Sequence, residues 1–509
     1  MLPAFLEPLP DAPQMRAIDA WATGRGGVAS LELMERAGSR LARLADELAP
    51  AGRIVVWAGK GNNGGDGLVA ARLLRDTGRT VDVIFAADPT LVTGDARINL
   101  DRLPGEPPRR GPGPPAAGGD GSGDGDGEAS LIVDALLGTG FAGEPRGEVG
   151  EAIAAINASG LPVLAADVPS GVDASSGEVA GLAVRAAATG TFHAAKPGLW
   201  IAPGKEHAGE VRVLDIGIPA GAPVEAGAGL IHPTVLGLIP RRRAASTKFE
   251  SGHVVVAGGS AGLTGAPCLA AEAAMRAGAG YVTVAVPASL SLVFETRLLE
   301  VMTRALPDAE GTLEAAGVET VLELGRRGGA LVLGPGLGRG GAEFARELAR
   351  RAAVPVVLDA DGLNAHAGRL EELADRADPT VLTPHDGELA RLLGVERTAV
   401  AAARLEHVRR AAALAGAIVV LKGDDTLIAA PDGTVAVSPG GTPALATAGT
   451  GDVLSGVLGA MLAKGIEPFA AACAAVMLHL LAGRRAAETH GAEGVIASDV
   501  IAALPRSLV

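Results

Sequence analysis

The chain alternates short apolar segments, each ending in a turn rich in glycine or acidic residues, with helical stretches. In the first half the apolar segments are Arg53–Ala58, Thr80–Phe85, Ser130–Ala135, Pro162–Ala166 and Val211–Ile216. Such alternation is typical of a parallel β-sheet with helices on both faces. The sequence therefore predicts an α/β fold, in which polar residues at the ends of neighbouring strands come together at one edge of the sheet.

A second series of the same kind follows a stretch in which glycine, proline and alanine dominate, residues 217–246. Its apolar segments are His253–Ala257, Tyr281–Val286, Ala330–Leu333, Pro355–Asp359, Thr380–Leu382 and Ile418–Leu421. A chain of 509 residues exceeds what one hydrophobic core usually organises. We expect two domains, over residues 1–230 and 240–509. Residues 104–128 have no large apolar side chain and are predicted to be a disordered Gly/Pro insertion in the first domain.

Composition excludes several classes of protein. The net charge is −14 and aromatic residues are only 2% of the chain, which disfavours both a phosphate-binding surface for nucleic acid and base stacking. Cys268 and Cys473 fall in apolar helical patterns and indicate core residues of a reduced protein. The most apolar stretch, Pro468–Gly483, contains a histidine and is too short for a membrane span. The expected location is the cytoplasm, with no membrane or nucleic-acid partner.

The first domain carries a glycine-rich loop, G-K-G-N-N-G-G-D-G, directly after its first apolar segment, at residues 59–67. The opening G-x-G-x-x-G can bind pyrophosphate at a helix N-terminus, but such turns are also common as plain strand–helix connections. The continuation N-N-G-G-D-G is more restrictive. Its amides and carboxylate supply oxygen ligands suited to a cation beside a phosphate or hydroxyl.

Three strand ends of the first domain could converge on one ion. Asn63 lies in the glycine-rich loop, Asp134 follows the segment L-I-V, and Ser170 lies in D-V-P-S-G after V-L-A-A. Each of these polar residues alone is explained as a helix cap or a turn residue. Their equivalent positions after three strands favour a shared cation site.

Four motifs of this half, G-N-N-G-G-D-G, V-D-A-L-L-G-T-G, D-V-P-S-G and F-H-A-A-K-P-G, resemble the NAD(P)H-hydrate epimerase family. The resemblance implies a Rossmann-like three-layer α/β/α domain that interconverts the R and S forms of hydrated NADH and NADPH at C6 of the nicotinamide ring. It implies a potassium ion held by Asn63, Asp134 and Ser170, and Asp167 as the catalytic acid–base. The residues implied to contact the dinucleotide are Asn62, Asn63, Gly64, Gly65, Asp66, Gly138, Thr139, Gly140, Phe141, Ala142, Gly143, Glu144 and Asp167.

In the second domain, G-T-G-D at residues 449–452 opens a helix. The backbone N–H groups of a helix start can bind an anion, and Asp452 could act there as a base toward a hydroxyl. A capped helix with close packing is the plain alternative. Companion motifs at other strand ends favour the active site: K-G-D-D-T from Lys422, T-P-H-D-G-E from Thr383, D-A-D-G-L-N from Asp359 and G-P-G-L-G from Gly334.

Together these motifs resemble the ribokinase-like fold and, within it, the ADP- or ATP-dependent NAD(P)H-hydrate dehydratases. The implied reaction phosphorylates the C6 hydroxyl of the S epimer and then eliminates phosphate, with Asp452 catalytic and Mg²⁺ accompanying the nucleotide. The residues implied to contact the hydrated dinucleotide are Ala266, Gly336, His385 and Asp452. Those implied to bind the adenine nucleotide are Lys422, Gly423, Asp424, Asp425, Thr426 and Gly451.

Both halves thus indicate one substrate, and an epimerase would supply the epimer that the dehydratase consumes. The alternative is a ribokinase-like small-molecule kinase fused to a non-catalytic dinucleotide-binding module. That reading leaves N-N-G-G-D and T-P-H-D-G-E unexplained. ADP or ATP is the expected donor, with ADP favoured, and a homo-oligomer is the expected assembly.

Overall fold

The computed structural model describes residues 2–111, 128–326 and 328–508. The chain forms two compact units: Pro8–Ala228 is the body of the first, and Pro3–Glu7 with Gly229–Val509 forms the second. Most of the predicted insertion, residues 112–127, lies outside the described residues. Its described beginning contains a two-residue strand, β4 (Arg109–Arg110), that the sequence did not predict.

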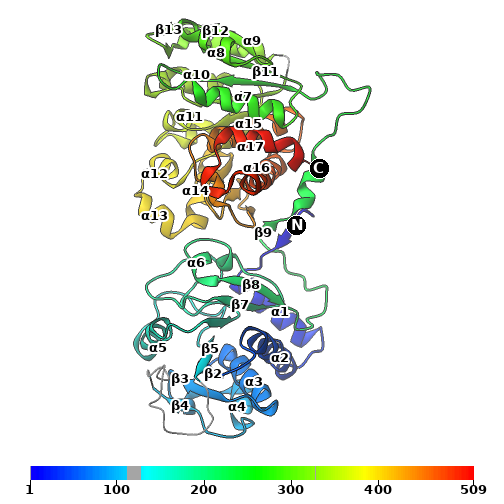
Figure 1. Cartoon of the computed structure of the whole chain (residues 1–509), viewed down its shortest axis with the longest axis vertical. Helices are drawn as coiled ribbons and strands as arrows, with labels where there is room; N and C mark the ends of the chain where they lie inside the picture. Colours follow the sequence, from blue (N-terminus) through cyan, green and yellow to red (C-terminus); the bar gives the residue numbers. More distant parts are fainter. Residues whose placement is uncertain (1, 112–127, 327, 509) are drawn as a thin grey trace. The chain divides into compact units, whose positions relative to one another are not determined.

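The first unit is built on a parallel sheet of seven described strands in the order β4-β3-β2-β5-β6-β7-β8 (Figure 1). After β4, these are β3 (Val81–Phe85), β2 (Arg53–Ala58), β5 (Ala129–Ala135), β6 (Val163–Ala166), β7 (Ala188–Phe192) and β8 (Glu210–Leu214). Its helices are α1 (Ala12–Gly24), α2 (Ser30–Leu48), α3 (Asn62–Asp76), α4 (Gly94–Asp101), α5 (Gly147–Ala158) and α6 (Lys205–Ala208).

Alternation along β2 explains the layers of this unit. Ile54, Val56 and Ala58 join a core with apolar residues of α1, α2 and α3, whereas Val55 and Trp57 join a second core with α5. Successive side chains of a strand point to opposite faces, so both faces of the sheet are covered by helices.

The second unit contains an eleven-stranded sheet, β1-β9-β20-β19-β18-β17-β16-β15-β10-β11-β12, within its described residues. Its strands are β1 (Leu6–Pro8), β9 (Ala228–Ile231), β20 (Val435–Val437), β19 (Leu427–Ala429), β18 (Ile418–Leu421), β17 (Thr380–Leu382), β16 (Val356–Leu358), β15 (Ala330–Leu333), β10 (His253–Ala257), β11 (Tyr281–Pro287) and β12 (Met302–Leu306). Within this order, the strands from β18 through β15 and β10 to β12 run parallel to one another. Strands β19 and β20 add an antiparallel hairpin next to β18. A separate pair, β13 (Asp308–Ala309) and β14 (Thr312–Leu313), is antiparallel.

Helices pack along this sheet in two groups. One group, whose members contact one another, is α7 (Gly265–Arg276), α15 (Thr450–Ala463), α16 (Pro468–His490) and α17 (Ala497–Ser507). The others are α8 (Ser291–Arg297), α9 (Val318–Gly325), α10 (Ala342–Arg351), α11 (Asp361–Asn364), α12 (Asp386–Leu393), α13 (Arg397–Ala402) and α14 (Arg404–Ala415). Both units are therefore α/β folds with parallel sheets, as predicted.

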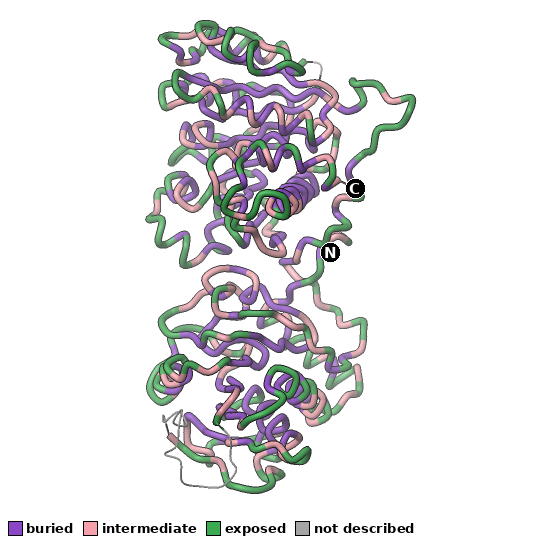
Figure 2. Tube along the Cα trace, viewed as in Figure 1, coloured by how far each residue is buried: buried purple, intermediate pink, exposed green. Residues whose placement is uncertain are grey.

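The apolar segment beginning at Pro468 forms α16, which Figure 2 shows as buried over most of its length. Among the described residues it is the one helix with the length and composition of a membrane span, but 83% of its most apolar window is buried. Cys473 on this helix and Cys268 on α7 are both buried, as predicted.

Candidate active sites

In the first unit, the loops that follow the neighbouring strands β2, β5 and β6 meet at the carboxyl edge of the sheet. Asn63 lies in the first turn of α3, and its Nδ2 donates to the carbonyl of Leu137 at 2.8 Å. Ser170 donates from Oγ to Asp134 Oδ1 at 2.6 Å and from its backbone N–H to Oδ2 at 2.8 Å. The backbone N–H of Leu137 donates to Ser170 Oγ at 2.9 Å. The three residues predicted to hold a cation therefore lie in one buried cluster.

The polar atoms of this cluster fit a cation. Among the described residues, no group donates a hydrogen bond to the buried Oδ1 atom of Asn63, and no lysine or arginine pairs with the fully buried Asp134. Burial raises the pKa of Asp134 to about 6, against the hydrogen bonds from Ser170 and Leu136 that lower it. A buried carboxylate without a counter-charge is costly, and amide, hydroxyl and carboxylate oxygens are the ligands of hard cations.

The glycines of the predicted dinucleotide loop allow close backbone approach. A Cβ on Gly64 would lie 1.9 Å from the carbonyl oxygen of Gly59, so α3 can begin at Asn62 only with glycine at this position. Gly138 approaches Asn63 in the same way, since its Cβ would lie 3.1 Å from that of Asn63. The predicted residues that follow Gly138 form a loop, half-buried to exposed, that runs outward from β5.

Asp167, the predicted catalytic residue, is paired with the fully buried Lys196. Lys196 Nζ donates to Asp167 Oδ1 at 2.6 Å, and also to Thr191 Oγ1 and the carbonyl of Phe192 at 2.8 and 2.9 Å. The Oδ1 atom also accepts from the Thr191 hydroxyl and the Phe192 N–H, both at 3.3 Å. No described residue donates to Oδ2. Asp167 has φ of 68°, a strained conformation for a residue with a side chain, and such strain gathers at functional sites.

Two further carboxylates, Asp66 and Asp19, interact electrostatically with this pair. Burial raises the pKa of Asp66, on α3, well above its usual range, and the charges of Asp167 and Asp19 add to the rise. Asp19 of α1 is exposed as a residue, yet groups packed around its carboxyl raise its pKa to about 6, partly offset by Lys196. Sequence reasoning assigned no role to Lys196 or Asp19. Lys196 stood within the motif F-H-A-A-K-P-G, whereas nothing in the sequence singled out Asp19.

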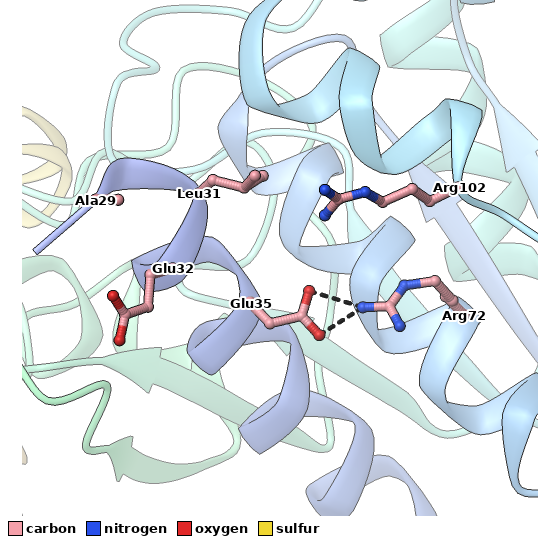
Figure 3. A pocket seen from close by; sticks show the side chains of 6 residues that line it. All are labelled: Ala29, Leu31, Glu32, Glu35, Arg72 and Arg102. Atoms are coloured by element: carbon pink, nitrogen blue, oxygen red, sulfur yellow. Dashed lines mark hydrogen bonds and ion pairs between the residues drawn. The ribbon is translucent and has the colours of Figure 1, made fainter.

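A separate pocket in the first unit is lined by Ala29, Leu31, Glu32, Glu35, Arg72 and Arg102 (Figure 3). Both carboxylate oxygens of Glu35 accept from Arg72, at 2.5 and 2.7 Å. None of the predicted site residues lines it, and its central charges neutralise each other.

In the second unit, the predicted motifs follow the adjacent strands β15, β16, β17 and β18. Lys422, after β18, donates from Nζ to Asp359 Oδ1 at 3.0 Å and lies 3.7 Å from Glu388 Oε2. Asp359 also accepts from Thr383 and from Ser455 of α15. Burial lowers the pKa of Lys422, but the neighbouring Asp359 and Glu388 carboxylates outweigh it and the net shift is upward.

Asp452 lies in the first turn of α15, beside this network. Burial raises its pKa to about 7, with Asp359 adding to the rise and Lys422 opposing it. Gly451 lies next to the lysine, because a Cβ there would be in van der Waals contact with Lys422 Nζ at 3.6 Å. A base with a pKa near 7, an ammonium group and the N–H groups of a helix start therefore share one site, which suits phosphoryl transfer to a hydroxyl.

His385 caps α12, and this fixes its tautomer. Its Nδ1 accepts from the N–H groups of Gly387 and Glu388 at 3.0 and 3.3 Å, while Glu388 Oε2 accepts from the His385 N–H at 2.9 Å. Burial lowers the pKa of His385. The neutral ring therefore carries its proton on Nε2, where it can donate to a ligand.

The remaining predicted residues of this unit fall into two places. A Cβ on Gly336 would lie 3.3 Å from the Cβ of Ala266, so these two predicted substrate contacts are neighbours. In the loop after Lys422, Thr426 donates from Oγ1 to the Gly423 carbonyl at 2.7 Å, and Asp424 accepts from the Gly441 N–H at 2.7 Å. No role was predicted for three residues of this site, Asp359, Glu388 and Ser455. Asp359 and Glu388 belong to the motifs D-A-D-G-L-N and T-P-H-D-G-E.

Fold and sites define a two-domain nucleotide enzyme, a Rossmann-like domain followed by a ribokinase-like domain. Residues 30–198 match the family model described as YjeF-related protein N-terminus, and residues 254–506 match NAD(P)H-hydrate dehydratase. The bifunctional NAD(P)H-hydrate repair enzyme Nnr of Moorella thermoacetica is 38% identical, over 97% of this chain and 95% of its own length. Its namesake from Pyrobaculum aerophilum is 40% identical, over 94% of each chain.

The solved structure of an ADP/ATP-dependent NAD(P)H-hydrate dehydratase from Bacillus subtilis, co-crystallised with ATP/Mg²⁺, is also similar. It is 31% identical, covers 54% of this chain and 94% of its own, and has a TM-score of 0.47. The chain belongs to the family of bifunctional NAD(P)H-hydrate repair enzymes, which combine an epimerase (isomerase) with a dehydratase (lyase). This confirms the family and the paired activities expected from the sequence.

Proposed function

We propose that Asp167 is the acid–base of the epimerase site. One of its oxygens is held by Lys196 and the other accepts no hydrogen bond from the described chain, so this second oxygen can meet the C6 hydroxyl of hydrated NAD(P)H. Residues Asn62–Asp66 and Gly138–Glu144 contact the dinucleotide on either side. The engagement of only one Asp167 oxygen is the observation that carries this assignment.

Potassium is the ion we assign to Asn63, Asp134 and Ser170. One carboxylate with neutral oxygens suits a weakly hydrated monovalent cation, and the bare Asn63 Oδ1 and the uncompensated Asp134 support it. When bound, the ion would supply a positive charge beside the dinucleotide. The hydrogen bonds of Asn63, Asp134 and Ser170 hold the loops that follow β2, β5 and β6 around the ion site.

In the second unit, Asp452 takes the proton of the C6 hydroxyl of the S epimer. The hydroxyl oxygen attacks the terminal phosphorus of the nucleotide, and the bond from that phosphorus to the leaving nucleotide breaks. Lys422 and the N–H groups of α15 face the transferred phosphoryl group. Phosphate then leaves C6 with its bonding electrons, because phosphate is a good leaving group and hydroxide a poor one, and the proton lost from the ring restores NAD(P)H.

Ligand contacts in this unit follow the same geometry. Ala266, Gly336, His385 and Asp452 contact the hydrated dinucleotide, and Lys422–Thr426 with Gly451 bind the adenine nucleotide, which arrives with Mg²⁺. The relative from Bacillus subtilis was co-crystallised with ATP/Mg²⁺. We infer ADP as the preferred donor here, a cytoplasmic location and a homo-oligomer.

The test follows the near-ultraviolet absorbance of NADH regained from mixed R and S hydrated NADH, with Mg²⁺, K⁺ and either ADP or ATP. Full recovery is expected for the unchanged chain, only the S portion for Asp167→Asn, and none for Asp452→Asn. Asp88→Asn and Asp432→Asn, at exposed turns of the first and second units, are the matched controls. Full recovery by either site variant would contradict the corresponding assignment.

A further inference from the structure

A buried arginine lies between the two ligand loops of the second unit. Arg404 is the first residue of α14, and only 4% of it is exposed. A cation at a helix N-terminus opposes the helix dipole, and a buried guanidinium is costly unless it is paired. Local helix formation therefore does not explain Arg404, and its contacts must.

Those contacts join two loops. The Nε of Arg404 donates to Asp425 Oδ2 at 3.0 Å, and one of its terminal nitrogens donates to the carbonyl of Lys422 at 3.3 Å. The other terminal nitrogen donates to the Asp386 carboxylate. The planar guanidinium thus holds the loop that follows β18 with two of its nitrogens and the start of α12 with the third.

Each loop has a proposed ligand. Residues Lys422–Thr426 are the proposed nucleotide loop, and Gly423 touches Arg404 closely, since a Cβ there would lie 2.5 Å from a terminal nitrogen. Asp386 directly follows His385, the proposed contact to hydrated NAD(P)H. The guanidinium of Arg404 therefore links Asp425 of the nucleotide loop directly to the residue that follows His385.

We propose that Arg404 is a positioning residue that couples nucleotide binding at Lys422–Thr426 to dinucleotide binding at His385. The inference rests on the proposed function of these two loops. Coupling between two ligands is reciprocal, so it can be measured on either one, and typical factors are about 5- to 150-fold. The guanidinium fork is what the coupling needs, because a lysine ammonium keeps the charge but cannot hold both carboxylates in one plane.

The experiment is calorimetric titration of the full chain with Mg–ADP, with and without saturating NADH. These two ligands do not react together, so binding is measured free of chemistry. The unchanged chain should bind ADP at least about 5-fold more tightly with NADH present. Arg404→Lys should bring that ratio close to one. Asp386→Asn, which removes only the dinucleotide side, should lower the ratio while leaving the Kd for ADP alone within about twofold.

The matched control is Arg376→Lys, which alters a half-buried arginine of the same unit that donates to the carbonyls of Ala352 and Val354, away from both loops. It should keep the ratio of the unchanged chain. A ratio near one in the unchanged chain, or an undiminished ratio in folded Arg404→Lys and Asp386→Asn, would overturn the proposal. Such a result with normal NADH recovery leaves the proposed function standing, whereas failure of ADP to bind at all contradicts that function itself.

Discussion

Lys196 Nζ lies 2.6 Å from Asp167 Oδ1, in an ion pair whose lysine side chain is 1% exposed and whose aspartate side chain is 11% exposed. Asp167 directly follows β6, and Lys196 lies in the loop that follows β7, so the ion pair joins these two loops. Because Lys196 holds Oδ1 together with the Thr191 hydroxyl and the Phe192 N–H, the carboxylate is fixed in orientation before any ligand arrives. Positioning of this kind is what acid–base catalysis on a bound hydroxyl needs.

Replacing Lys196 with methionine should destabilise the first unit by about 3–5 kcal/mol, because it leaves a buried carboxylate without its partner. The measurement is urea unfolding followed by a probe of the first unit. Asp167→Asn combined with Lys196→Met removes both charges and should regain much of that stability without regaining epimerisation. Equal stability of Lys196→Met and the unchanged chain would show that the pair contributes nothing to folding.

The potassium assignment predicts an ion-specific stabilisation. Binding to the folded state alone raises the unfolding temperature of the first unit in KCl but not in choline chloride at equal ionic strength. Asp134→Ala should remove both this difference and the potassium dependence of epimerisation. Glu148→Ala, an exposed carboxylate on α5, serves as the control and should keep both. An identical response to choline would argue against the site.

The loops that carry the sites could be predicted from the sequence, because a parallel sheet brings its strand ends to one edge whatever the helices do. The cluster of Asn63, Asp134 and Ser170 was predicted in this way. The position of Lys196 could not be predicted. Strand β7, A-T-G-T-F, has threonines and a glycine where an apolar run is expected, so no strand is predicted before that lysine.

Long-range pairing explains the other omissions. Lys422 pairs with Asp359 and Glu388, and Ser455 donates to Asp359. These residues are far apart in the sequence, and no spacing rule connects them. Strands β19 and β20 were not predicted; they form an antiparallel hairpin outside the alternation of strands and helices. Strand β12 was missed because most of its residues are at least partly exposed and include an arginine.

The raised pKa of Asp452 predicts how the rate of the dehydratase depends on pH. Burial raises its pKa to about 7, and only the ionised form can accept a proton. With S-hydrated NADH, kcat/KM should fall about tenfold per pH unit below 7 and level off above it. A profile flat from pH 5 to 8, with chemistry rate-limiting, would exclude Asp452 as the base.

The same shift predicts a gain in stability on removing the carboxyl. A folded-state pKa above the ordinary value of 3.8 means that the folded chain binds the proton more tightly, so this group costs stability increasingly as pH rises from about 4 to 7. Asp452→Asn should therefore unfold at a higher temperature than the unchanged chain at pH 8, with the difference vanishing near pH 4. A less stable variant at pH 8 would mean that the ionised carboxylate is favourably paired.

His385 allows its two roles to be separated by substitution. Asparagine at this N-cap can still accept from the first N–H groups of α12, so His385→Asn should keep the helix, whereas His385→Ala should lose about 1 kcal/mol of stability with the cap.

Neither variant carries the Nε2–H donor. Loss of one hydrogen bond to the dinucleotide, worth about 1 kcal/mol, should raise the KM for S-hydrated NADH about fivefold in both variants. The KM for ADP should change much less, because the proposed nucleotide loop is anchored by Lys422 and Asp425. Initial-rate measurements over a matrix of both substrates give the two constants together. An unchanged KM for S-hydrated NADH in His385→Asn would leave His385 as a helix cap only.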